Sequence, residues 1–216
     1  MKTNKRLFFT GMAFIILFAL WTVLIQIIDV KSIGVNGTDV GFATINSRFH
    51  SLIGVNMTLY SITDWAGLVP IFVCMLFGVT GLFQAVKRKS LIKVDSDIII
   101  LGVYYVIVIL CYLIFEMIPV NYRPILINGI MEASYPSSTT LLVLCVMPTL
   151  VFQVKNRVKN VTFKTIICII TILFSVFMVA GRLISGVHWV TDIIGSVFLS
   201  AGLYNLYKAF AFNKNI

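Results

Sequence analysis

The amino-acid sequence predicts an all-α polytopic membrane protein, a bundle of six transmembrane helices. Of its 216 residues, 59% are hydrophobic and 12% are charged, against roughly 45–50% and 25% in soluble domains. A soluble protein of this size cannot cover its surface with so few charges. Six apolar runs approach the ~20 residues needed to span the hydrocarbon of a bilayer. Because these runs lack breaks at strand length, helices are favoured over a β-barrel.

The expected helices follow one another along the whole chain. The first run follows basic residues, as a secretory signal does, but it is longer than the apolar part of a signal and no small-x-small cleavage pattern ends it. We therefore expect a retained first helix, and a single membrane domain over 1–216 with its motif-bearing core at about 97–211. The segment of about 29–65, rich in Gly, Asn, Ser and Thr, is expected to be a long outer loop. The six spans are expected at about 7–28, 66–86, 97–118, 137–154, 163–181 and 190–211.

Positive charges predict the orientation of the bundle. Six spans place both termini on one side, and only Lys31, Arg48, Arg123 and Arg182 among the 17 Lys and Arg residues fall on the other. By the positive-inside rule the termini are cytoplasmic. The net charge of +9 is thus explained by the membrane topology, and no nucleic-acid partner is expected. We expect the protein to lie in the plasma membrane. The residues counted as cytoplasmic are Lys2, Lys5, Arg6, Lys87, Arg88, Lys89, Lys93, Lys155, Arg157, Lys159, Lys164, Lys208 and Lys214.

The sequence contains no pattern of a metal or cofactor site. Each of the four cysteines lies inside an apolar run, and no pair has the spacing of metal ligands or of a disulfide framework. No zinc, haem or nucleotide motif occurs. We expect no cofactor and no resident metal, and we expect the cysteines to be small buried residues. They are Cys74, Cys111, Cys145 and Cys168.

Ionisable side chains gather where the expected helices reach the outer side. Arg182 lies at the end of the fifth span, and His188 and Asp192 lie at the start of the sixth. His188 and Asp192 are four residues apart, so they share one helix face. A carboxylate beside an imidazole fixes its tautomer and leaves the other nitrogen free to attack or to accept a proton. Ionisable groups near a membrane span are costly, so these residues are candidates for function.

The start of the fourth span completes a pattern typical of an anion site. Pro136 followed by Ser137, Ser138 and Thr139 suits a helix N-terminus, whose free amides can hold an anion. Arg123 lies in the loop that enters this helix. Two guanidiniums and a helix N-terminus beside an activated histidine indicate a phosphate site.

These residues resemble the type 2 phosphatidic acid phosphatase / vanadium haloperoxidase superfamily. The membrane branch of that superfamily has six helices and three motifs, Lys-x6-Arg-Pro, Pro-Ser-Gly-His and Ser-Arg-x5-His-x3-Asp, on the outer face. Arg123-Pro124 matches the end of the first motif, and Pro136-Ser137 the start of the second. The third motif is nearly intact, since only its Ser is replaced. The residues that match the third motif are Gly181, Arg182, His188 and Asp192.

The resemblance implies a lipid phosphatase without a metal. His188 is implied to attack phosphorus and form a phosphohistidine, and Asp192 to orient the imidazole. The substrate is implied to be a lipid phosphate or diphosphate, such as a polyprenyl diphosphate or a phosphatidate-like lipid. The implied ligands of its phosphate oxygens are Arg123, Arg182, Ser137, Ser138 and Thr139.

Two positions depart from the family pattern. Glu116 stands where the first motif has Lys, and Thr139 stands where the second has the His that protonates the leaving group. A threonine hydroxyl is a poor general acid near neutral pH. Loss of the general acid affects an alkoxide leaving group most, so we expect a preference for a lipid diphosphate over a phosphate monoester. Candidate substitute acids are Glu116, Glu132 and His50.

Three functions stay open from the sequence. The first is a working lipid phosphatase. The second is a non-catalytic protein that binds lipid phosphate, in which Glu116 pairs with Arg123. The third is a helical bundle or small transporter with incidental polar residues, because a fold match does not guarantee function. If Arg123, Arg182 and His188 converge on one phosphate-sized site, the third is disfavoured.

Overall fold

The computed structural model describes residues 4–211. Lys2 and Lys214, which were counted among the cytoplasmic charges, lie outside the described residues. Within 4–211 the chain is all-helical, with isolated bridges but no β-strand, so the all-α part of the predicted fold class is confirmed. Two short 3-10 helices are Val35–Gly37 and Leu91–Lys93. The α-helices are α1 (Lys5–Ile27), α2 (Ala43–Ile53), α3 (Met57–Ala66), α4 (Leu68–Arg88), α5 (Ser96–Met117), α6 (Ser138–Arg157), α7 (Val161–Ile184) and α8 (Val190–Ala211).

Five segments of the described chain are long and apolar enough to cross a membrane: α1, α3 with α4, α5, α6 and α7. They coincide with the first five predicted spans. The sixth, α8, has 22 residues and also lies where a span is predicted. It is less apolar because it carries the buried polar residues Asp192, Ser196 and Ser200. The count of six spans therefore stays a prediction.

The predicted outer loop of about 29–65 contains two helices, α2 and α3, so this expectation was wrong in part. The side chain of Asn56 accepts a hydrogen bond from the amide of Leu59 at 2.9 Å and begins α3. Gly54, at φ 69°, ends α2. Composition rich in Gly and Asn predicts a loop, but here these residues are the ends of two short helices.

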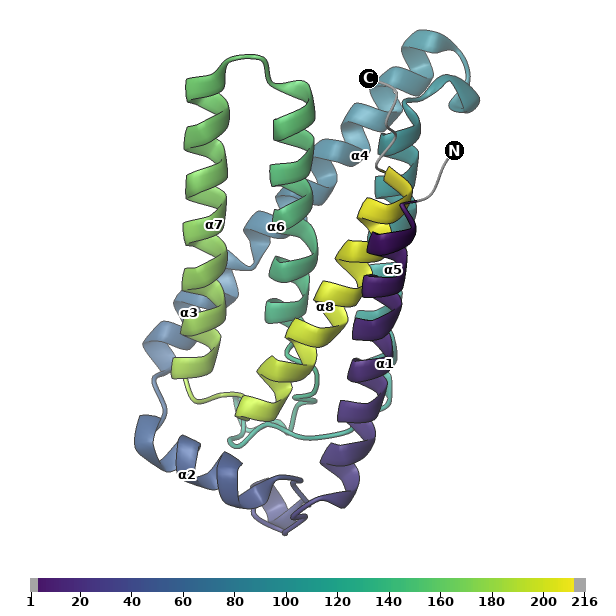
Figure 1. Ribbon diagram of the computed structural model, residues 1–216. Coiled ribbons are helices and arrows are strands. Elements are labelled where there is room, and N and C mark those ends of the chain that lie inside the picture. The colour runs from purple at the N-terminus through teal and green to yellow at the C-terminus, as the bar shows by residue number, and fades with distance from the viewer. Residues whose placement is uncertain (1–3, 212–216) are drawn as a thin grey trace.

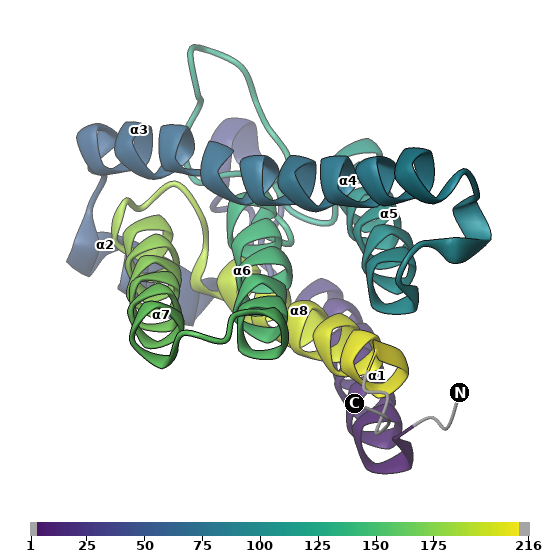
Figure 2. The same cartoon turned by 90° about the horizontal axis from the view of Figure 1, so that it is seen from above.

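The helices form a bundle around α6 (Figure 1). α6 packs against α4, α5, α7 and α8, and much of its surface is buried. α1 lies along α8, where the two glycines Gly11 and Gly202 allow close approach: a Cβ on Gly11 would lie 3.0 Å from the carbonyl oxygen of Gly202. Figure 2 shows α3 and α4 following one another almost in a line along one edge of the bundle.

The two ends of the bundle differ in character. At one end, called the site end below, α5 and α7 finish, α6 and α8 begin, and α2 lies across the helices (Figure 1). The opposite end carries basic residues and a network in which Arg157 contacts Asp97 at 2.7 Å and Asp95 at 3.1 Å. Arg88 contacts Asp95 at 2.8 Å, and this hydrogen bond lowers the pKa of Asp95. The network joins the ends of α4, α5 and α6.

Candidate active site

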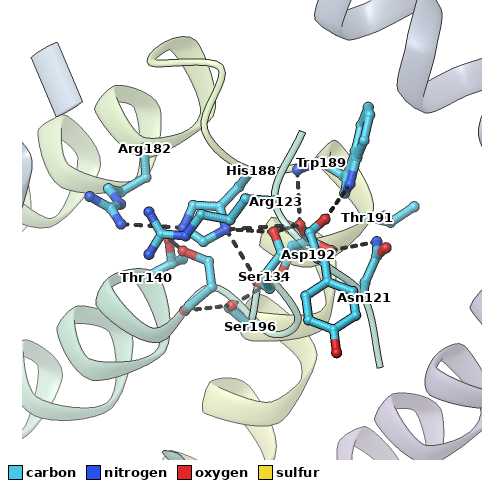
Figure 3. Close-up of polar contacts among 12 residues, drawn as sticks. Asn121, Arg123, Ser134, Thr140, Arg182, His188, Trp189, Thr191, Asp192 and Ser196 are labelled. Carbon is cyan, nitrogen blue, oxygen red and sulfur yellow. Dashed lines mark hydrogen bonds and ion pairs between the residues drawn. The ribbon is translucent and has the colours of Figure 1, made fainter. Parts of the chain in front are cut away.

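Four predicted site residues from separate segments meet at the site end (Figure 3). Arg123 comes from the α5–α6 connection, Arg182 from the last turn of α7, His188 from the α7–α8 turn and Asp192 from the first turn of α8. All four are buried, with His188 3% and Asp192 0% exposed. The convergence expected from the sequence spacing is therefore present.

Two local structures bring these residues together. In the α5–α6 connection, Asn128 and Gly129 have φ of 51° and 78°, as in a type I′ hairpin turn. The hairpin pairs Arg123 with Glu132 and Asn121 with Ser134 through backbone hydrogen bonds of 3.1 and 2.9 Å. It therefore holds Arg123 and Ser134 at the site.

The α7–α8 turn depends on one glycine. Gly186 has φ 69°, and a Cβ at this position would lie 1.9 Å from the carbonyl oxygen of Gly54. Only glycine fits this conformation and this approach. The turn places His188 back beside Arg182, six residues earlier in the chain.

The two nitrogens of His188 face different partners. Nε2 lies 3.2 Å from Nη2 of Arg182. Nδ1 lies 3.1 Å from the hydroxyl and 3.2 Å from the carbonyl oxygen of Ser134. Burial, together with the charges of Arg182 and Arg123, holds the pKa of His188 well below its usual value. The imidazole is therefore neutral at pH 7, with a nitrogen available to act as a nucleophile.

Asp192 lies next to the imidazole without a direct hydrogen bond to it. Its Oδ2 is 3.8 Å from Nδ1 of His188, beyond the range of a hydrogen bond. Oδ2 accepts from the Ser134 hydroxyl and, at 2.9 Å, from the amide of Trp189. Oδ1 accepts from Nδ2 of Asn121 at 3.3 Å.

The two arginines present free donors inside the protein. Arg182 is 1% and Arg123 7% exposed. Both guanidiniums lie over the ring of Tyr60, at 4.9 and 5.6 Å from its centroid. Nε and Nη1 of Arg123 and Nε of Arg182 have no hydrogen-bond partner among residues 4–211. Buried donors without acceptors are costly, and two such guanidiniums side by side suit an anion with several oxygens, such as a phosphate group.

Each guanidinium also has one carboxylate nearby. Arg123 Nη2 lies 3.0 Å from Glu132 Oε2, so Arg123 pairs with Glu132 and not with Glu116, the partner considered for the non-catalytic alternative. The hairpin explains this, because its backbone hydrogen bonds place residue 132 opposite residue 123. Arg182 Nη1 lies 3.5 Å from Asp64 Oδ1, which is more than half exposed.

Comparisons with known proteins identify the family of the chain. The sequence model of the PAP2 superfamily matches residues 98–216. The chain belongs to the PAP2 superfamily. The resemblance inferred from its motifs is thereby confirmed, and the PAP2 region contains every predicted site residue. A comparison with curated proteins gives no match.

The PAP2 fold extends beyond the matched region. The chain is similar to the crystal structure of the first transmembrane PAP2 type phosphatidylglycerolphosphate phosphatase from Bacillus subtilis, with a TM-score of 0.64 and 19% sequence identity. The match covers 94% of this chain and 96% of that one. With its apolar helices, the chain is an integral membrane protein of the PAP2 superfamily.

The start of α6 lies beside Asp192, with the Ser137 amide 3.3 Å from the Asp192 carbonyl oxygen, but its side chains do not join the arginines. The hydroxyl of Ser137 contacts Thr140 at 3.0 Å. Ser138 and Thr139 line a cavity of about 440 Å³ between α4, α5 and α6, to which Asp64 also contributes. In the described part of the chain, no side-chain hydrogen bond links Ser137, Ser138 or Thr139 to Arg123, Arg182 or His188. Their expected contacts with phosphate oxygens stay a prediction.

Several residues at the site were not anticipated. Tyr60 and Asp64 come from α3, a helix that the sequence did not predict and that lies before the region matched by the PAP2 model. Ser134 and Asn121 come from the hairpin, whose Asn128-Gly129 pair was a recognisable signal. Among residues 4–211 no group of three or more His, Cys, Asp or Glu side chains is arranged to hold a metal ion.

Proposed function

We propose that this PAP2 protein is a lipid phosphatase that transfers the terminal phosphoryl group of a lipid phosphate or diphosphate to His188 and then to water. The observation that carries the proposal is the position of Nε2 of the buried, neutral His188, 3.2 Å from Arg182 and beside donors of two buried guanidiniums that lack partners among the described residues. A nucleophile and donors for an oxyanion thus lie side by side.

The first chemical step uses the lone pair of Nε2. As the bond from Nε2 to phosphorus forms, the bond from phosphorus to the leaving oxygen breaks and its electron pair stays on that oxygen. Arg123 and Arg182 neutralise the equatorial oxygens, where charge spreads in the transition state. Water then attacks the phosphohistidine, the electron pair of the P–N bond returns to Nε2, and phosphate leaves.

The leaving group decides which substrate is favoured. Thr139 occupies the position at which the family has its general acid, and general acid catalysis contributes ~10²–10⁴-fold. Cleavage of a lipid diphosphate releases a lipid monophosphate, which is a stable anion. Cleavage of a phosphate monoester releases an alkoxide, which needs a proton. The protein therefore favours a lipid diphosphate, of which a polyprenyl diphosphate is an example, over a phosphate monoester.

An apolar cavity beside the site, and a second one that continues it away from the site, suit the hydrocarbon part of such a substrate. The cavity next to Ser138 and Thr139 is lined mainly by apolar residues of α4, α5 and α6. A second cavity of about 810 Å³ between α4 and α5 shares Ile71 and Ile109 with it. An apolar lining binds a hydrocarbon chain and not a water-soluble phosphate compound, so these cavities support a lipid substrate.

The proposed location follows from the distribution of charge. Basic side chains concentrate at the end opposite the site, which by the positive-inside rule is cytoplasmic. The protein then resides in the plasma membrane with α8 as a sixth span, both termini cytoplasmic and the active site on the extracytoplasmic face. The described basic residues nearest that end include Lys87, Arg88, Lys89, Lys93, Lys155 and Arg157.

Phosphate release by the purified protein tests the proposal. Matched lipid diphosphate and monophosphate are compared, and a label on the terminal phosphorus is trapped as phosphohistidine. The chain has two histidines, so His188→Ala should abolish the label while His50→Gln retains it. Equal rates on the two substrates would refute the diphosphate preference, and label that persists in His188→Ala would refute the nucleophile.

A non-catalytic lipid-phosphate-binding protein is the alternative. The carboxylates Glu132 and Asp64 beside the two arginines and the replaced general acid favour it. The oriented imidazole argues against it, because headgroup binding requires no nucleophile. Binding of lipid phosphate without any labelled His188 would establish this alternative.

A further inference from the structure

The connection between Asp192 and His188 runs through a third side chain. The 3.8 Å between Asp192 Oδ2 and His188 Nδ1 is too long for a hydrogen bond, which a separation of about 3.6 Å already excludes. The hydroxyl of Ser134 lies between them, 3.1 Å from Nδ1 and in hydrogen-bond contact with Oδ2. Figure 3 shows Ser134, His188 and Asp192 in this arrangement.

The direction of each hydrogen bond follows from counting donors. Both oxygens of Asp192 already accept from N–H groups, Oδ2 from Trp189 and Oδ1 from Asn121, as expected of a carboxylate. A carboxylate only accepts, so the single hydroxyl proton of Ser134 points to Asp192. The lone pairs of Ser134 Oγ therefore face Nδ1, and the proton of the neutral imidazole must reside on Nδ1.

This assignment leaves Nε2 without a proton. The carbonyl oxygen of Ser134, 3.2 Å from Nδ1, is a second acceptor and favours the same tautomer. Nε2 accepts from Nη2 of Arg182, which carries only donors. Ser134 thus presents the nucleophilic nitrogen toward the arginines.

The position of Ser134 is fixed by its surroundings. Its side chain is buried, with the residue 1% exposed, and its amide donates to Asn121 across the hairpin at 2.9 Å. The next residue, Tyr135, packs against Gly195 of α8, where any Cβ would lie 2.4 Å from the Tyr135 ring. Ser134 is therefore held on the axis between Asp192 and His188.

We propose that Ser134 is a positioning residue that couples Asp192 to His188, a role that rests on the proposed phosphoryl transfer. When Nε2 bonds to phosphorus, positive charge develops on the imidazole. The Nδ1–H bond to Ser134 Oγ then strengthens, and so does the Ser134 hydroxyl bond to Asp192. The carboxylate stabilises the charged ring through the serine, and no proton has to leave Nδ1.

A double-mutant cycle tests the coupling. Ser134→Ala should lower kcat about 10- to 100-fold, the range of a hydrogen bond to a charged group, with KM changed less than about twofold. If Asp192 acts through Ser134, adding Ser134→Ala to Asp192→Asn should cost no further activity. Two losses that multiply would overturn the proposal. Ser134→Thr, which keeps the hydroxyl, should retain more activity than Ser134→Ala.

A second readout does not require turnover. Because the chain has two histidines, imidazole nitrogens labelled with ¹⁵N give two sets of NMR signals, assigned with His50→Gln. The Nδ1–H proton of His188 should move upfield in both Ser134→Ala and Asp192→Asn, while the His50 signals stay unchanged and report an intact fold. Movement only in Asp192→Asn would overturn the proposal. If the Nδ1–H proton shifts as expected but the protein hydrolyses no lipid phosphate, the phosphatase function is refuted. The coupling of Asp192 to His188 through Ser134 is then still supported.

Discussion

Nη2 of Arg182 donates to Nε2 of His188 across 3.2 Å. The nitrogen that attacks phosphorus in the proposed reaction is therefore covered by one of the groups that bind the phosphate. A guanidinium has five N–H donors in a planar fork, and Nε of Arg182 has no partner in the described chain. When phosphate binds, one of its oxygens can accept the hydrogen bond of Arg182 Nη2 in place of His188 Nε2, and Nε2 is then free to attack.

Replacement of Arg182 should affect chemistry more than fold. Arg182→Gln is expected to lower kcat/KM by about 10²–10³-fold, the cost of removing one donor from an oxyanion site. Arg182→Lys should not restore the rate, because an ammonium cannot present two parallel donors. Steady-state kinetics on a lipid diphosphate measure both effects. Arg48→Gln, the same loss of charge at an exposed position of α2, is the control, and a comparable loss in Arg48→Gln would contradict the assignment.

The same arginine should reduce stability while no ligand is bound. Two buried guanidiniums beside Tyr60 repel one another, and an apolar replacement of a buried charge is often neutral or stabilising. Arg182→Met should therefore unfold at the same or a higher temperature than the wild type in buffer without phosphate. Inorganic phosphate at 100 times Kd should stabilise the wild type by about 2.7 kcal/mol and so raise its unfolding temperature, and it should leave the unfolding temperature of Arg182→Met unchanged. A phosphate response of equal size in both proteins would refute the site.

The sequence predicted the parts of the site that are local in the chain. Arg182, His188 and Asp192 fall within eleven positions, so helix periodicity and motif spacing suffice to place them together. Arg123 lies farther away, but Arg123-Pro124 precedes Pro136-Ser137 in the same order as the two motifs of the family. The same is true of the spans, since apolar length alone locates α1, α4, α5, α6 and α7.

The parts that were missed depend on tertiary contacts. Tyr60 and Asp64 reach the site because α3 packs on α7, and nothing in the local composition of 29–65 indicates that packing. In the sequence nothing distinguishes Ser134 from other loop serines. Only the hairpin, which pairs residue 134 with residue 121, places it at the site. The pairing of Arg123 with Glu132 instead of Glu116 has the same origin.

Restoring the family residue at position 139 should restore activity on monoesters. Thr139 borders the cavity of about 440 Å³, so an imidazole has room there. Thr139→His should raise hydrolysis of a lipid monophosphate by roughly 10²-fold or more and change diphosphate hydrolysis little. Thr139→Asn, which is polar but not acidic, is the control. Rates on the monophosphate that stay equal in wild type and Thr139→His would show that the missing acid is not what limits this substrate.

The lowered pKa of His188 gives a defined pH dependence. The folded protein keeps His188 neutral even below pH 6.5, the usual histidine pKa. The rate of phosphohistidine formation should therefore begin to fall, through protonation of His188, only below pH 6.5. The unfolded chain binds this proton first, so stability should fall as pH drops below about 6.5. Single-turnover labelling measures the first effect. Thermal unfolding of wild type and His188→Gln measures the second, and a wild type that gains stability relative to His188→Gln on acidification would contradict the lowered pKa.

Gly195 connects packing to the geometry of the site. It lies one turn after Asp192 on α8, and a Cβ there would lie 2.4 and 2.7 Å from two ring atoms of Tyr135, the neighbour of Ser134. Gly195→Ala should therefore displace the hairpin, lower stability by about 1–3 kcal/mol through overpacking and reduce activity further by moving Ser134 away from His188. Gly78→Ala is the matched control, because its Cβ would have no neighbour within 4 Å in the described structure. It should gain up to about 1 kcal/mol from helix propensity. Thermal unfolding and phosphate release decide the comparison, and a fully active Gly195→Ala would show that the site does not depend on this contact.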